Sequence, residues 1–355
     1  MIAGLAVGWA MLVLLLRLGW RAFWAGIAAL CVAGMLASGL LPPDHPLHRQ
    51  FGADWRAWAL PLLLVAAGLA YRAGLVRLKS RIPAAQPPTA DPPKGPFTPD
   101  ELTRYARHIL LREVGGPGQR RLKDARVLVV GAGGLGSPAI LYLAAAGVGH
   151  LTVIDDDRVE PSNLQRQIIH RTGDVGSPKA ESAARAVTAL NPFVTVTPLA
   201  ERLTAERAAE LFPGHDLILD GTDNFATREL VNAAAVAARR PLIAGAITQW
   251  EGQVTLYDPA RGGPCLTCLF PEAPAPGLAP TCAEAGVIAP LPGIVGSIMA
   301  LEAVKVLTGA GEPLRGRMLL WDGLYADTRI IATERRVDCP VCGGAQALDE
   351  PDAKP

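Results

Sequence analysis

Hydrophobic residues dominate the start of the chain, where they form three long runs at residues 2–16, 22–41 and 55–71. A helix needs about 20 apolar residues to cross a bilayer, and the second and third runs satisfy this requirement. The first run does so only if it continues toward Trp20, with Arg17 near the membrane edge, where a long basic side chain can reach water. We therefore expect three transmembrane helices within residues 1–76. A cleaved signal peptide is the alternative for the first run, but that run lacks a basic start.

Basic residues predict the orientation of these helices. Two arginines separate the first two runs, and four basic residues follow the third: Arg17 and Arg21, then Arg72, Arg77, Lys79 and Arg81. The positive-inside rule places both groups in the cytoplasm. The expected protein is thus a multi-pass cell-membrane protein whose later domain is cytoplasmic. His45 and His48 could bind a metal in the opposite loop, but a solvated loop explains them better.

From residue 97 onward, short strand-like runs alternate with helical patterns. Strands are expected at 126–130, 151–155, 194–196, 216–220 and 241–246, and helices at about 137–146, 177–190, 204–212 and 226–239. This alternation predicts a doubly wound, Rossmann-like α/β fold with a mostly parallel sheet. Antiparallel strands are expected at 253–257, 317–321 and 327–331, with an apolar helix at about 293–308.

A capped helix precedes this alternation. Thr98 is expected to cap it, Pro99 to take its first position, and Glu101 to complete a capping box. Leu102, Tyr105 and Ile109 lie on one face. The glycine- and proline-rich segment 115–118 is expected to end this element.

Composition excludes some functions. The net charge is +1, so bulk charge gives no case for nucleic-acid binding. Half of the residues are hydrophobic, which follows from residues 1–76. The six cysteines include two C-x-x-C pairs beside a nucleotide-type fold, a pattern that indicates a reducing compartment with metal rather than secreted disulfides.

A glycine-rich turn follows the strand at 126–130. Gly131, Gly133 and Gly136 satisfy G-x-G-x-x-G, and a helix follows whose N-terminal N–H groups can face a phosphate. The next strand ends at Asp155, where a carboxylate can hold a ribose hydroxyl. A glycine-rich turn in an unliganded sheet is the alternative, but this context favours nucleotide binding.

Further polar residues are expected at the carboxyl ends of the strands. They are Asp156, Asp157, Asn163, Arg166, Lys179, Asp223 and Asn224. Ligands of open α/β sheets bind at these ends. Arg166 and Lys179 facing phosphate, with Asp223 facing Mg²⁺, would suit nucleotidyl transfer. A nicotinamide enzyme needs no such set.

The cysteines predict a second site. The pairs Cys265/Cys268 and Cys339/Cys342 suit one tetrahedral Zn²⁺ with four thiolates and no open position, which is typical of a structural site. Two unrelated pairs of small buried residues are the alternative. Cys282 follows a proline-rich stretch and could be a nucleophile or simply a small residue.

These motifs together resemble the MoeB/ThiF/HesA family of ubiquitin-like-protein activating enzymes. The resemblance covers about residues 97–343. It is carried by the motifs RYARH (104–108), GAGGLG (131–136), SNLQRQ (162–167), GSPK (176–179), GTDN (221–224), EGQ (251–253), TCAEAGV (281–287) and both C-x-x-C pairs. The resemblance is strongest to the molybdopterin-synthase adenylyltransferase type. It implies ATP-dependent adenylylation of the C-terminal Gly-Gly carboxylate of a ubiquitin-like sulfur carrier.

The resemblance also implies roles for single residues. Gly134 would lie against the nucleotide and Asp155 would hold the ribose. Asn163, Arg166 and Lys179 would contact phosphates, and Asp223 would hold Mg²⁺. Arg107 matches an arginine that reaches across a homodimer into the partner's ATP site. Cys282 matches a cysteine that links covalently to the carrier in some thiamine-pathway relatives.

The expected organisation is therefore a transmembrane region at 1–76, a Pro-rich linker at 77–96, an ATP-binding adenylyltransferase domain at 97–345 and a tail at 346–355. The usual family member is soluble, so the first region lies outside the resemblance. No sulfurtransferase domain follows Cys342, so sulfur is expected from a separate protein. The alternatives are an adenylyltransferase for the thiamine-pathway carrier, an NAD-dependent oxidoreductase and an inactive membrane scaffold.

Overall fold

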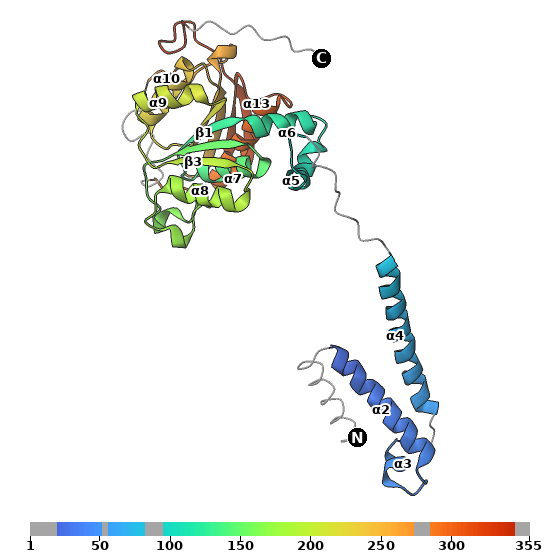
Figure 1. Cartoon of the computed structure of the whole chain (residues 1–355). Coiled ribbons are helices and arrows are strands. Elements are labelled where there is room, and N and C mark those ends of the chain that lie inside the picture. Colours follow the sequence, from blue (N-terminus) through green and yellow to red (C-terminus); the bar gives the residue numbers. More distant parts are fainter. Residues whose placement is uncertain (1–19, 52–55, 82–94, 273–284, 345–355) are drawn as a thin grey trace. The chain divides into compact units, whose positions relative to one another are not determined.

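The computed structural model describes residues 20–51, 56–81, 95–272 and 285–344. The chain divides into two compact units, Met1–Lys94 and Gly95–Pro355 (Figure 1). Cys282 lies outside the described residues, as do the first hydrophobic run up to Gly19 and the tail 346–355.

The second unit is built on one eight-stranded sheet. Its strands are β1 (Arg126–Val130), β2 (His150–Ile154), β3 (Thr195–Leu199), β4 (Leu217–Asp220), β5 (Leu242–Ile247), β6 (Glu251–Tyr257), β7 (Arg317–Asp322) and β8 (Asp327–Ala332). They are ordered β3-β2-β1-β4-β5-β6-β7-β8. The first five in this order are parallel, and β6, β7 and β8 each run antiparallel to the strand before them. The expected Rossmann-like sheet with a C-terminal antiparallel part is therefore confirmed.

Helices pack on both faces of this sheet, and further helices pack on those. They are α5 (Pro99–Ile109), α6 (Gly115–Asp124), α7 (Gly136–Ala146), α8 (Lys179–Leu190), α9 (Ala205–Leu211), α10 (Phe225–Ala237), α11 (Leu266–Leu269) and α13 (Pro290–Thr308). Short 3₁₀ turns occur at Pro161–Asn163, Thr172–Asp174, Phe212–Gly214 and Pro259–Arg261.

Strand β1 shows why the sheet needs two helical layers. Val127 and Val129 pack with α7, α8 and α13 on one face. Leu128 and Val130 pack with α9 and α10 on the other (Figure 1). All four side chains are buried, so the strand is a continuous apolar run rather than an alternating one, as is typical of parallel sheets.

The start of α5 agrees with the prediction from the sequence, but the segment that follows α5 does not. Thr98 caps α5, and both hydrogen bonds of the capping box with Glu101 are present. The expectation that residues 115–118 end an element is wrong, because α6 begins at Gly115. Pro117 falls in the first turn of α6, where a backbone N–H has no helical partner to lose.

Gly136 closes the glycine-rich turn by close backbone contact. A Cβ atom there would lie 1.9 Å from the carbonyl oxygen of Gly131. Replacing glycine with alanine normally stabilises a helix. Here the steric clash with Gly131 should make the same substitution destabilising. We expect Gly136→Ala to lower the free energy of unfolding by about 1–3 kcal/mol or more, measured by urea denaturation.

Gly173→Ala is the matched control for this prediction. A Cβ at Gly173 meets nothing within 4 Å, and its φ is not positive. Equal stability of the two variants would show that the contact between Gly136 and Gly131 is not tight in solution.

The first unit contains α2 (Trp20–Leu40), α3 (Pro46–Phe51) and α4 (Arg56–Arg81). Helices α2 and α4 approach closely at Gly34, where a Cβ would lie 2.6 Å from the ring of Trp58. Ser38 on the same helix donates a hydrogen bond of 2.8 Å to the Gly34 carbonyl.

The described residues do not support the predicted multi-pass membrane location. Within them, the one helix long and apolar enough to cross a bilayer is α13, and half of its apolar window is buried against the rest of the protein. Its apolarity is that of a core helix, since it packs on α7 and the sheet. In α2 only the shorter stretch Gly26–Leu40 is apolar enough, and α4 continues through several basic residues.

The two edges of the sheet differ. At one edge, Thr195 of β3 donates its N–H to Gly149, on the inner side. Because successive N–H groups alternate sides, the nitrogen of Pro198 faces outward, and it carries no hydrogen. At the other edge, β8 ends the sheet with exposed Ile330 and Ile331.

Candidate active site

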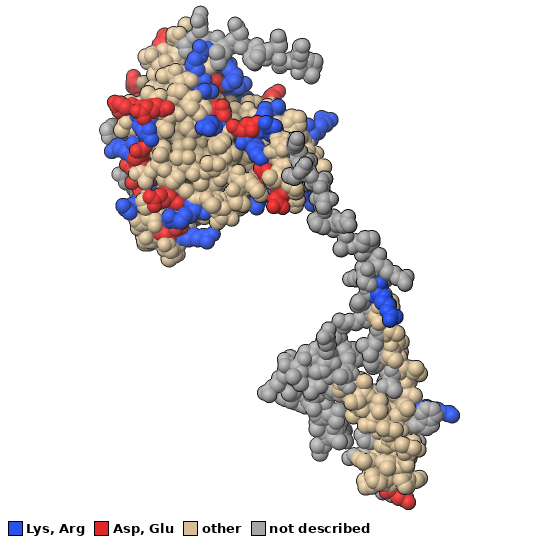
Figure 2. Space-filling view, viewed as in Figure 1, with Lys and Arg blue, Asp and Glu red and all other residues tan. Residues whose placement is uncertain are grey.

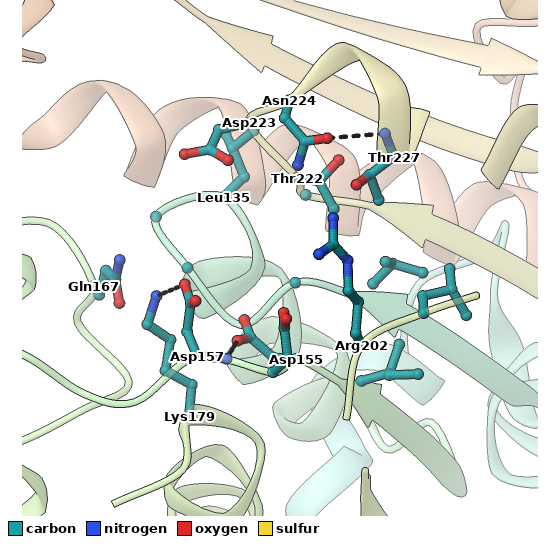
Figure 3. A pocket seen from close by; sticks show the side chains of 18 of the residues that line it. Leu135, Asp155, Asp157, Gln167, Lys179, Arg202, Thr222, Asp223, Asn224 and Thr227 are labelled. Atoms are coloured by element: carbon teal, nitrogen blue, oxygen red, sulfur yellow. Dashed lines mark hydrogen bonds and ion pairs between the residues drawn. The ribbon is translucent and has the colours of Figure 1, made fainter. Parts of the chain in front are cut away.

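A cavity of about 360 Å³ lies at the carboxyl ends of β1, β2 and β4. Most residues expected at the strand ends line it: Gly131, Gly133, Gly134, Asp155, Asp156, Asp157, Arg166, Lys179, Asp223 and Asn224. Figure 3 shows acidic, basic and amide side chains converging on it from separate loops. The loops after three strands thus form one polar pocket.

Asp155 holds the glycine-rich turn. Its carboxylate accepts the N–H of Ala132 at 2.7 Å and the N–H of Asp157 at 2.8 Å. Burial raises the pKa of this carboxyl group, and the backbone N–H of Ala132 and the charge of Lys179 oppose that rise. The carboxylate therefore both lines the cavity and fixes the backbone beside it.

Lys179 is the buried cation of the site. It is the first residue of α8, and its ammonium lies 2.7 Å from Asp157 Oδ2 (Figure 3). Its side chain is only 7% exposed, whereas that of Asp157 is 68% exposed. A cation in the first turn of a helix opposes the helix dipole. Nearby negative charge compensates for this, and Asp157 supplies it here.

The loop after β4 presents Asp223 to the cavity. Asp220 is fully buried and accepts hydrogen bonds from the backbone and hydroxyl of Thr222 at 2.9 and 2.7 Å. Asn224 caps α10 by accepting the N–H of Thr227 at 2.9 Å. Asp223 lies between these two anchors, and within the described part of the chain its carboxylate has no hydrogen-bond or ion-pair partner.

Three of the expected residues do not line this cavity. Gly136 packs against Gly131 instead. Asn163 bonds locally to the backbone of Glu160 and to Ser162. Arg107 is exposed on α5, and no residue of α5 borders the cavity.

Other lining residues were not singled out from the sequence. Arg202, in the loop after β3, extends its guanidinium group into the pocket (Figure 3). Gln167 is 4% exposed, and its Oε1 is buried without a partner in the described residues. Gln167 belongs to the SNLQRQ motif, and its position next to Arg166 in the sequence could have identified it as a residue of the site.

The four cysteines of the two pairs form a separate buried cluster. Their ligand atoms lie within 4.8 Å of one another. The Cys265–Cys268, Cys265–Cys339 and Cys268–Cys342 sulfur separations are 3.8, 3.6 and 3.4 Å. Tetrahedral zinc with bonds of about 2.3 Å requires sulfurs about 3.8 Å apart. The cluster therefore fits zinc, with no side left open for a catalytic water.

The chain is similar in sequence to proteins of one known family. The ThiF family profile matches residues 105–341. This chain belongs to the ThiF family. Among its relatives is the sulfur carrier protein adenylyltransferase of Thermus thermophilus, with 52% identity over 72% of this chain and 94% of that protein. Another is the molybdopterin-synthase adenylyltransferase of Escherichia coli, with 47% identity over 68% of this chain and 97% of that protein.

Solved structures show the same fold. The crystal structure of E. coli MccB superposes with a TM-score of 0.60 and 24% identity, covering 69% of this chain and 73% of that one. As a ThiF family member, the chain has the sheet and strand-end pocket that its sequence predicted. Both curated relatives named above are adenylyltransferases.

Proposed function

We propose that this ThiF family member is an ATP-dependent adenylyltransferase. Its substrate is the C-terminal glycine of a ubiquitin-like sulfur carrier of the molybdopterin-synthase small-subunit type, in molybdenum cofactor biosynthesis. The observation that carries this proposal is the single cavity that collects the glycine-rich turn, Asp155, Arg166, Lys179 and Asp223. The names of the relatives support the same activity.

The cavity divides by chemistry. The backbone of Gly133 and Gly134, with Arg166 and Lys179, forms the end suited to phosphates. Asp155 marks the ribose position. Val130, Ile154 and Leu203 are apolar residues of one cluster that also border the cavity, and they suit the base.

The reaction needs little beyond positioning. A carboxylate oxygen of the carrier attacks the α-phosphorus in line, and the bond to the bridging oxygen breaks to release pyrophosphate. The carboxylate is already ionised at pH 7, so no protein base is required. Arg166 and Lys179 stabilise the charge that develops on the phosphate oxygens.

Two metals belong to this proposal. Asp223 is the exposed carboxylate that would hold Mg²⁺, since no side chain in the described residues competes for it. Bound Mg²⁺ would neutralise phosphate charge. Zn²⁺ in the cysteine cluster would be structural.

A second cavity offers a place for the carrier's tail. It has a volume of about 300 Å³ and lies against β6 and β7, lined by residues that include Gly252, Gln253 and Trp321. Ile247 borders both cavities. An extended C-terminus lying in the second cavity would therefore point into the first.

The thiamine-pathway carrier is the alternative substrate, because the cavity residues above are assigned to ATP, which the adenylylation of either carrier would use. ATP–pyrophosphate exchange by the full-length protein, with each candidate carrier supplied in turn, tests both class and substrate. Exchange with the molybdopterin-type carrier alone supports the proposal. Exchange with the thiamine-type carrier alone reassigns the pathway, and exchange with neither contradicts the activity.

Arg107 gives a prediction about assembly. We propose that the protein acts as a homodimer and that Arg107 serves the partner's pocket. Arg107→Ala and Asp223→Ala proteins, each weak alone, should regain up to about half of the exchange activity per active dimer when mixed and allowed to exchange subunits. The reason is that one pocket of a mixed dimer has both defects and the other has neither.

The matched control mixes Lys179→Ala with Asp223→Ala. Both of these residues line the same cavity of one chain, so each pocket of that mixed dimer keeps one defect. If the Arg107→Ala mixture gains no more activity than this control, Arg107 does not act across subunits.

A further inference from the structure

A buried histidine beside the cavity has no role in the proposed reaction. His170 is 6% exposed and follows the SNLQRQ motif. Its Nε2 lies 2.9 Å from the carbonyl oxygen of Ala132, in the glycine-rich turn. Its Nδ1 lies 2.8 Å from the hydroxyl of Ser182, one turn after Lys179 on α8. One imidazole ring thus joins the two elements that would hold phosphate.

The partners define the protonation state of this ring. A carbonyl oxygen can only accept a hydrogen bond, so Nε2 carries the proton and donates it to Ala132. In the neutral ring Nδ1 then accepts from the Ser182 hydroxyl. Burial lowers the pKa of His170, and the hydrogen bond to Ala132 opposes this effect. The charges of Lys179 and Arg185 lower the pKa further, whereas that of Asp174 raises it.

These contacts close a ring of hydrogen bonds around one end of the cavity. Beyond Ala132, the ring runs through Asp155 to Asp157, and the ammonium of Lys179 completes it at 2.7 Å from Asp157. Helix α8 joins Lys179 to Ser182. Figure 3 shows the part of the ring that contains Asp155, Asp157 and Lys179. Each hydrogen bond of this ring joins buried or cavity-lining groups.

The bond to Ala132 has a directional consequence. In a planar trans peptide, the C=O of one residue and the N–H of the next point in opposite directions. Because His170 holds the carbonyl of Ala132, the N–H of Gly133 must point away from His170. Gly133 lines the cavity, and its N–H is one of the donors that a phosphate would use.

We propose that His170 is a positioning residue that orients the Ala132–Gly133 peptide and fixes it relative to Lys179, so that both are preorganised for the phosphates of a nucleotide. This inference rests on the proposed ATP site. It assigns His170 no contact with the substrate. Its effect is on the affinity for nucleotide, because a free loop would lose entropy on binding.

Three substitutions of His170 separate its two bonds. A glutamine amide nitrogen reaches the position of Nε2, so His170→Gln keeps a donor for Ala132. An asparagine amide reaches only the position of Nδ1, so His170→Asn keeps the contact with Ser182 alone. His170→Leu removes both. Thr188→Ala is the control, because Thr188 lies on α8 and, among the described residues, its side chain bonds only to the Ala184 carbonyl of its own helix.

The experiment is titration calorimetry of each full-length protein with Mg·ATP, with a thermal melt to verify folding. We expect His170→Asn and His170→Leu to weaken binding about tenfold or more, and His170→Gln to bind within about threefold of the original protein. Thr188→Ala should not differ from it. If the His170→Leu protein does not fold, the comparison of His170→Asn with His170→Gln decides.

Two outcomes overturn the inference while leaving the proposed function intact. One is His170→Asn binding as tightly as the original protein. The other is His170→Gln binding as weakly as His170→Asn when both are folded. If the unsubstituted protein itself does not bind Mg·ATP, the proposed function fails, and this inference fails with it.

Discussion

Replacing Asp223 with alanine is expected to reduce carrier-dependent ATP–pyrophosphate exchange by a factor of about 10² to 10³. The carboxylate is held at the edge of the cavity by a loop anchored at Asp220 and Asn224. It has no partner of its own in the described residues, so its removal should leave the loop folded. The loss would fall on the stabilisation of phosphate charge through Mg²⁺.

Asp124→Ala is the control for this substitution. Asp124 is an exposed carboxylate on α6 that pairs with Arg120 at 2.7 Å, and such surface pairs contribute little. Exchange rates and circular dichroism spectra of both variants should be compared with those of the original protein. Near-normal exchange by folded Asp223→Ala protein would rule out the assigned role.

Replacing Cys339 with serine is expected to release the zinc and destabilise the second unit. The four sulfurs converge within the protein, and binding free energies of structural zinc are about 10–16 kcal/mol in small peptides. Because binding and folding are coupled, a loss of this size would be comparable with the whole stability of an ordinary domain, about 5–15 kcal/mol. Elemental analysis should show one zinc per original chain and none in the variant.

Cys31→Ser provides the matched control. Cys31 is also buried, but it lies on α2 and outside the cluster. The Cys31→Ser protein should retain its zinc after the same purification. One zinc per chain in the Cys339→Ser protein would contradict the proposed ligand set.

The layout of the second unit could be predicted because its sequence repeats a simple physical pattern. Apolar runs such as β1 alternate with helices. Strands that are joined through helices lie parallel, so the parallel part of the sheet could be predicted. Helix α6 was missed because Gly115 and Pro117 are typical of turns. Their positions in the first turn, where a proline costs little, could not be read from composition.

The candidate site was predictable to the same extent. Residues that follow strands, such as Asp155 and Asp223, had to meet at one edge of a parallel sheet. The role of His170 was not predictable. Its partner Ala132 lies 38 residues earlier, and a lone histidine in a loop has no characteristic spacing. The role of Arg107 is a separate case, because the pocket that it is proposed to serve belongs to the other chain of a dimer.

The transmembrane prediction for residues 1–76 is not supported by the described residues. Apolar length predicted membrane spans there, yet among described residues the helix that best meets this criterion is α13, a core helix. Buried core and lipid impose the same apolar composition, so a run of hydrophobic residues cannot by itself distinguish them.

The unequal edges of the sheet limit how copies of this protein can aggregate. Strand β3 has Pro198 where an outward N–H would be, so it cannot readily accept an added strand. Strand β8 has no such block. Among the described residues, β8 is therefore the edge more open to an added strand. A β8-to-β8 contact would use the more open edge of both copies, which favours growth that stops at two copies over growth into a fibre.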